Sequence, residues 1–182
     1  MTLRKLRGFL VLILITIGCD KTTKVAEAPP DDPRRYTESS SRTGFSYLPP
    51  EGWKLETQPQ GFRIARGEVT DGVSPYIMID IGLLPESFDK LIDNRRSDYS
   101  VSPSNKNISE VPFQTSAGLK GTKFVFERNG KTRMQMYVLD GGNRYFQFQC
   151  AASVQSGDKF DQTFDDAVKS LWASPTWKPV TD

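Results

Sequence analysis

The sequence of 182 residues contains no histidine. Histidine is the most common general base in enzymes and the most common metal ligand, so Ser-His-Asp and Cys-His catalysis within this chain are excluded. Glycine-rich phosphate loops and Cys-x-x-Cys motifs are also missing. We therefore expect a binding role rather than an enzymatic one, with no cofactor and no metal site.

Most of the chain has no excess of positive charge. The net charge is +2, but three of the 24 basic residues, Arg4, Lys5 and Arg7, lie close to the N-terminus. Beyond residue 18 the chain has 21 basic and 22 acidic residues. This balance gives no electrostatic basis for binding a polyanion, so we expect no nucleic-acid partner.

The longest apolar run, Phe9–Ile17, is interrupted only by Thr16 and is shorter than the ~20 residues that a spanning helix needs. A basic start before a short apolar stretch is typical of a secretory signal. The stretch ends at Ile17-Gly18-Cys19, which resembles the lipobox of bacterial lipoproteins, except that Thr16 stands where Leu is usual. The resemblance implies that Cys19 becomes the first mature residue and carries lipid. The alternative is an ordinary cysteine after a conventional signal.

Composition predicts four regions along the chain. Residues 1–18 are the signal peptide, 19–43 the lipidated cysteine and a flexible tether, 44–175 the folded domain, and 176–182 a C-terminal tail. The tether is rich in Pro, Ser and charge, and its reach is roughly 25–30 Å. We expect attachment to a bacterial membrane through the N-terminal lipid, in the cell envelope, on the periplasmic or outer face. Asp20, next to the cysteine, resembles an inner-membrane retention signal, but this signal does not decide between the inner and the outer membrane.

The domain is expected to be α+β, because strands, a helix, strands and a helix follow one another. A first helix begins after Ser87 as N-cap and ends in the polar run Asp93–Arg96, followed by a loop over 97–107. A second helix covers about Asp158–Trp172, with an apolar stripe that starts at Phe160. The early strands are expected at 45–48, 53–57, 62–69 and 76–83.

The segment 119–152 is predicted to be a three-stranded meander with one apolar face. That face carries Phe124, Phe126, Met134, Met136, Val138, Phe146, Phe148 and Cys150. Paired residues of an antiparallel ladder share a face, so both turns need an odd number of residues. A loop Arg128–Gly130 then pairs Phe124 with Met134, and Cys150 is expected to be a buried apolar side chain.

The polar side of this meander is the candidate protein-interaction face, since Tyr and Arg favour recognition surfaces. The alternative is that the first helix or the N-terminal strands cover it. Asp161, Asp165 and Asp166 are expected on the solvated side of the last helix. The face consists of Lys123, Arg133, Gln135, Tyr137, Tyr145, Gln147 and Gln149.

The segment Phe45–Trp53, FSYLPPEGW, resembles the start of the PsbP-like superfamily. The order of the expected elements agrees with that family over residues 44–173. The resemblance implies a single domain with an antiparallel sheet and helices packed on its faces, an αβα sandwich. It also implies a role in binding, assembling or stabilising larger complexes. Metal sites proposed in the family involve His, so no ligand is carried over to this chain.

Two functions agree with these observations. The first is a membrane-anchored envelope lipoprotein that acts as a non-enzymatic binding or assembly module within an envelope protein complex. The second is an envelope protein that binds a small ligand or a lipid, which would require an apolar cavity.

Overall fold

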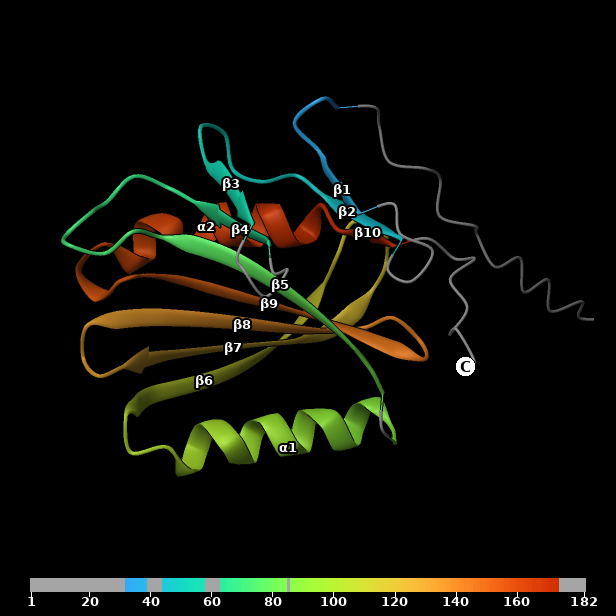
Figure 1. Cartoon of the computed structure of the whole chain (residues 1–182). Coiled ribbons are helices and arrows are strands. Elements are labelled where there is room, and N and C mark those ends of the chain that lie inside the picture. The colour runs from blue at the N-terminus through green and yellow to red at the C-terminus, as the bar shows by residue number, and fades with distance from the viewer. Residues whose placement is uncertain (1–31, 39–43, 58–62, 85, 174–182) are drawn as a thin grey trace, which may run out of the picture.

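Alternating apolar residues build a seven-stranded antiparallel sheet in the order β3-β4-β5-β9-β8-β7-β6 (Figure 1). The computed structural model describes residues 32–38, 44–57, 63–84 and 86–173, so Cys19 lies outside the described residues. The strands are β3 (Lys54–Thr57), β4 (Arg63–Arg66), β5 (Tyr76–Leu83), β6 (Asn105–Gln114), β7 (Lys120–Arg128), β8 (Thr132–Asp140) and β9 (Arg144–Ser153).

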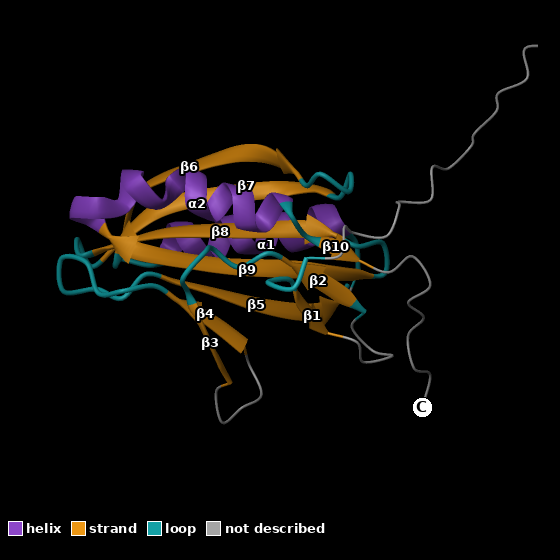
Figure 2. Cartoon of the chain, turned by 90° about the horizontal axis from the view of Figure 1, so that it is seen from above, coloured by secondary structure: helices purple, strands orange, loops and turns teal. Residues whose placement is uncertain are grey.

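Two helices cover opposite faces of this sheet: α1 (Phe88–Val101) and α2 (Gly157–Lys169), the latter preceded by the short 3₁₀ helix η1 (Val154–Ser156). In Figure 2, α2 crosses above the central strands and α1 lies beneath them. Each helix has its own apolar cluster on the sheet. The expected α+β architecture, with an antiparallel sheet and helices on its faces, is confirmed.

A second, three-stranded sheet joins both ends of the described chain. It consists of β1 (Tyr36–Glu38), β2 (Phe45–Tyr47) and β10 (Trp172–Ala173), with β2 in the middle. Tyr36 is buried against the rings of Phe45 and Tyr47. The folded part therefore begins inside the segment 19–43 that was expected to be tether, because a buried aromatic side chain stabilises a strand there.

The expectation of a single apolar face on the meander is wrong. Asp140 pairs with Tyr145, which leaves an even number of residues in the turn Gly141–Arg144. Phe148 consequently pairs with Tyr137, on the α2 side, whereas Met136 pairs with Gln149 on the α1 side. The prediction of an odd turn assumed that only one face of the sheet is buried. The sheet is instead the middle layer of three and buries apolar residues on both of its faces.

The turn between β7 and β8 does contain an odd number of residues, and Gly130 has the expected left-handed conformation with φ of 62°. The turn is Asn129–Lys131 rather than Arg128–Gly130, so Phe124 pairs with Met136 and not with Met134. The shift is by two residues, and it therefore preserves the predicted faces of β7 and β8.

Helix α1 is longer than expected, and strand β6 was not expected at all. Ser87 caps α1 through its hydroxyl, as predicted, but the helix continues to Val101 because Tyr99 extends the buried stripe and packs on Phe124 and Phe126. Strand β6 is exposed along nearly its whole length and contains Pro112. Proline is tolerated in an edge strand, and such a strand has no apolar alternation that would predict it.

Cys150 is fully buried on the α2 side, and burial raises the pKa of its thiol well above the usual range. We expect native protein to react with a thiol reagent at pH 8 about a hundredfold more slowly than unfolded protein, since only the accessible thiolate reacts. The measurement compares labelling rates with and without denaturant, in protein whose Cys19 is lipidated or replaced by Ser. Equal rates would contradict the placement of Cys150 in the core.

Candidate functional site

A polar network lies between α2 and the sheet. The ammonium group of Lys123 donates to Asp165 Oδ1 at 2.8 Å and lies 5.2 Å from the centre of the Tyr137 ring. The Tyr137 hydroxyl lies 2.6 Å from both Gln135 Oε1 and Asp165 Oδ1, and has one proton to donate between them. Tyr137 and Gln135 are 0 % exposed and Lys123 is 8 % exposed, so the network is inside the domain.

Arg133 extends this network toward the start of α2. Its guanidinium donates to both carboxylate oxygens of Asp161, at 3.1 Å and 2.8 Å, and the Gln135 amide donates to Asp161 as well. Asp161 and Asp165 therefore face the sheet, contrary to the expectation of a solvated side, whereas Asp166 is exposed as expected. The four-residue spacing of Asp161 and Asp165 places them on one helix face, beside buried Phe164.

The network holds α2 in place and buries its three central side chains, whereas the arginine–aspartate pair at its edge stays partly exposed. Burial and the neighbouring carboxylate of Asp165 raise the pKa of Tyr137 far above its usual range, so the hydroxyl stays protonated. Buried polar groups that are satisfied by one another fix the register between two packed elements. We interpret Lys123, Gln135 and Tyr137 as a polar clamp between sheet and helix.

The other members of the candidate interaction face lie on the opposite side of the sheet. Tyr145, Gln147 and Gln149 are half-buried and share the α1 side with Tyr76, whose hydroxyl accepts a hydrogen bond of 2.6 Å from the Gln149 amide. The seven residues therefore do not form one surface. The physical reason is the even turn between β8 and β9, which exchanges the faces of β9 relative to the prediction.

Replacing Tyr137 tests the polar clamp. We expect Tyr137→Phe to lower the free energy of unfolding by about 1–3 kcal/mol, because the buried Gln135 and Asp165 lose a partner. Tyr137→Ala should cost about 3–5 kcal/mol, since it also leaves a cavity. The matched control is Tyr145→Phe on the opposite face, with a change within about 0.5 kcal/mol. Urea unfolding measures all three, and an unchanged Tyr137→Phe would contradict the clamp.

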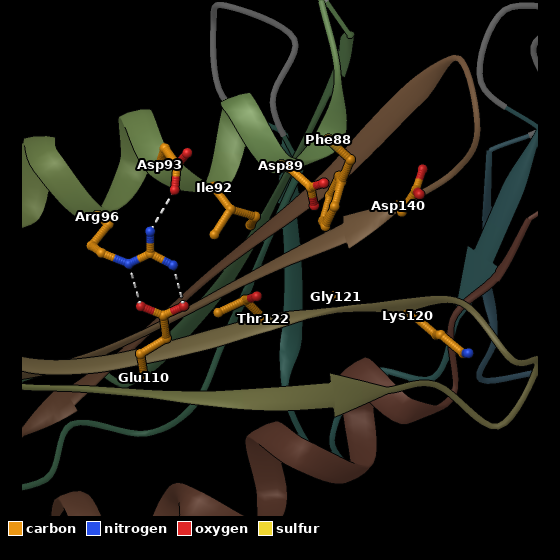
Figure 3. Close-up of a pocket in the computed structure, with 10 residues that line it drawn as sticks. All are labelled: Phe88, Asp89, Ile92, Asp93, Arg96, Glu110, Lys120, Gly121, Thr122 and Asp140. Atoms are coloured by element: carbon orange, nitrogen blue, oxygen red, sulfur yellow. Dashed lines mark hydrogen bonds and ion pairs between the residues drawn. The ribbon is translucent and has the colours of Figure 1, made fainter.

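A surface cleft of about 450 Å³ lies between α1 and the adjoining parts of β6, β7 and β8 (Figure 3). Phe88 and Ile92 point from α1 toward the sheet and form its apolar wall. Gly121 lies opposite on β7, where an added Cβ would stand 1.9 Å from the carbonyl oxygen of Val138. The rest of the lining is polar or charged: Asp89, Asp93, Arg96, Glu110, Lys120, Thr122 and Asp140.

An ion pair crosses the cleft from helix to strand. Arg96 donates to both carboxylate oxygens of Glu110 at 2.8 Å and to Asp93 at 2.5 Å. The hydrogen bonds from Arg96 lower the pKa of the Glu110 carboxyl and keep it ionised. The pair connects α1 to the edge strand β6 at one end of the cleft.

The remaining charges give the rim of the cleft a negative excess. Four carboxylates line it against two cations, and Arg96 lies between two of those carboxylates. Asp140 accepts a hydrogen bond from the Gly142 amide, and Asp89 lies in the first turn of α1. An apolar wall below an acidic rim suits a basic group with an apolar stem, such as a Lys or Arg side chain or an organic amine.

The sequence did not reveal the cleft because its two walls lie on elements whose packing was not predicted, and one of its residues lies on an unpredicted strand. Asp93 and Arg96 were expected to end the first helix, and Glu110 lies on the unexpected strand β6. A signal was nevertheless present, since Tyr99 continues the spacing of Leu91 and Ile92 by two further turns. Within the described residues, no group of three or more Cys, Asp or Glu has the geometry of a metal site.

Comparison with solved structures finds the same fold in two proteins. The first is the cyanobacterial PsbP protein CyanoP from Synechocystis sp. PCC 6803, with a TM-score of 0.54 and 11% identity; the match covers 76% of this chain and 91% of that one. The second is LpqN, described as involved in cell envelope biogenesis of Mycobacterium tuberculosis, with a TM-score of 0.56 and 10% identity, over 78% and 90% of the two chains. No family model and no curated protein matches the sequence. These likenesses show the PsbP-like fold.

Proposed function

We propose that this chain is a lipid-anchored protein of the bacterial cell envelope that acts as a non-enzymatic binding or assembly module. The basic start, the short apolar run and Gly18-Cys19 support the anchor. Within the described ranges, no helix is long and apolar enough to span a bilayer. The fold shared with LpqN, itself an envelope biogenesis protein, agrees with this location.

The observation that carries the binding role is the cleft beside α1. Its volume of about 450 Å³ lies within the range of about 300–1,000 Å³ that is usual for binding sites. Its polar residues come from four separate elements and converge on an apolar wall, an arrangement that is usual in binding sites. We propose that a basic side chain of a partner protein enters this cleft and interacts with Asp89 and Asp140.

The absence of an enzymatic role is part of this proposal. Its support is the lack of histidine in the whole sequence and the condition of the reactive groups that the structure describes. The Cys150 thiol is buried with a raised pKa, and Lys123 and Tyr137 are engaged in the polar clamp under α2. None of these groups lines the cleft.

The second candidate function is binding of a small organic amine by the same cleft. The volume favours it, because a free ligand of that size could be held as well as a side chain. A fatty acyl chain is disfavoured, since the cleft is open and its rim is charged.

The anchor is tested by Cys19→Ser. The variant should accumulate as unprocessed precursor and should not incorporate labelled palmitate, because no thiol remains for lipid attachment. Membrane fractionation and palmitate labelling measure the change, and Cys150→Ala serves as the matched cysteine control. Normal incorporation of palmitate by Cys19→Ser would refute the proposed anchor.

The cleft is tested by the double variant Asp89→Asn, Asp140→Asn. The protein is isolated from native membranes, the partner or ligand that co-purifies is identified, and its affinity is then measured by titration. We expect the double variant to bind about tenfold more weakly, or about 1.4 kcal/mol, because two charges of the rim are lost.

The matched control for the cleft is Asp98→Asn, Asp166→Asn, which removes two exposed carboxylates outside the cleft. This control should keep full affinity. Co-purification of a protein whose basic side chain is required supports the first candidate, and a bound amine detected by native mass spectrometry supports the second. Equal affinities of the two double variants would show that the cleft is not the binding site.

A further inference from the structure

The segment Asp32–Glu38 is docked on the domain by specific contacts. The Arg35 guanidinium donates to Ser46 Oγ at 3.2 Å and to the carbonyl oxygen of Ser170 at 3.0 Å. The next residue, Tyr36, is buried, and its strand pairs with β2 from Tyr36 to Glu38. A buried ring and a strand ladder therefore hold this segment against β2, and the Arg35 guanidinium joins it to Ser170, far away in the sequence.

The docking point is the C-terminal end of α2. Ser170 follows that helix directly, so Arg35 places a positive charge on a terminal carbonyl, where the helix dipole favours it. The Ser170 hydroxyl in turn accepts a hydrogen bond of 2.7 Å from the Leu48 amide. Helix end, strand β2 and N-terminal segment thus form one connected unit.

This unit lies at one end of the central sheet. The carbonyl of Lys169, at the end of α2, accepts a hydrogen bond from Ser116 in the turn between β6 and β7. Gly157, at the start of α2, instead lies against the side chain of Arg133 near the other end of β8. Strand β8 has nine residues, so these two ends of the central sheet are about 30 Å apart.

We propose that Asp32–Glu38 is a strap that shortens the lipid tether and holds the α2 C-terminal end of the domain toward the bilayer surface. This inference rests on the proposed lipid at Cys19. With the strap docked, only residues 20–31 separate the lipidated cysteine from the domain, and they span at most about 40 Å. Without the strap, the free segment would extend to Thr43 and could span about 80 Å, twice the reach of the docked tether.

The experiment measures the distance of each end of the domain from the membrane. The lipidated protein is reconstituted in phosphatidylethanolamine–phosphatidylglycerol vesicles that contain a headgroup-labelled acceptor. A donor dye is attached to Asn143→Cys in the turn between β8 and β9, or to Lys131→Cys in the turn between β7 and β8. Both positions are exposed, whereas native Cys150 is buried and stays unlabelled. We expect several-fold more energy transfer from position 143 than from position 131.

Two changes should reduce this difference. Arg35→Ala with Tyr36→Ala releases the strap, and an insertion that doubles the segment 20–31 lengthens the tether while the strap stays docked. Arg34→Ala is the matched control, because within the described residues the hydrogen bonds of Arg34 are with Asp32, and the difference should persist. The insertion variant leaves the folded residues intact and therefore tests the proposal even where the double variant unfolds.

The outcomes separate the strap from the anchor. Equal transfer from the two positions in vesicle-bound wild-type protein would overturn the strap, and so would an undiminished difference in the insertion variant. Failure of the wild-type protein to associate with vesicles, or association of Cys19→Ser at the wild-type level, would instead overturn the lipid anchor.

Discussion

Burial of both faces of the central sheet is the constraint on which the rest of the structure depends. Strand β8 supplies Met134, Met136 and Val138 to one helix and Tyr137 and Leu139 to the other, and all five are essentially inaccessible to solvent. A middle layer of this kind requires a helix on each face. Each helix must also provide hydrogen-bond partners for the polar side chains of the sheet that it buries. Helix α2 does so with Asp161 and Asp165, which meet the cations and hydroxyl of the sheet.

The sequence is sufficient to predict what each strand carries on alternate residues, but not how neighbouring strands are aligned. The faces of Phe124 and Phe126, and of Phe146 and Phe148, follow from period two within each strand. Which residues of β8 and β9 share a face depends on whether the turn between them has an odd or an even number of residues. Both alternatives bury large apolar side chains. When either face can be buried, hydrophobic patterning no longer selects the register.

The candidate site was harder to foresee than the core, for a related reason. A core residue is recognised by its apolar character, whereas Glu110 contributes to the cleft only through the position of β6, an exposed edge strand. The polar residues that did attract attention, Lys123 and Tyr137, have partners on a helix about thirty to forty residues later in the chain. Polar character alone does not distinguish a recognition surface from an internal hydrogen-bond network.

Strand β2 lies between two strands from opposite ends of the domain, and this has a kinetic consequence. Arg35 and Ser170, which close the small sheet, are 135 residues apart in the sequence. Contacts of such high sequence separation form late, because the loop they close has a large entropic cost. During synthesis the N-terminal residues are made first, whereas the Ser170 carbonyl that accepts from Arg35 is made only after the last helix. The small sheet can therefore reach its three-stranded form only once β10, the last of the described strands, is in place.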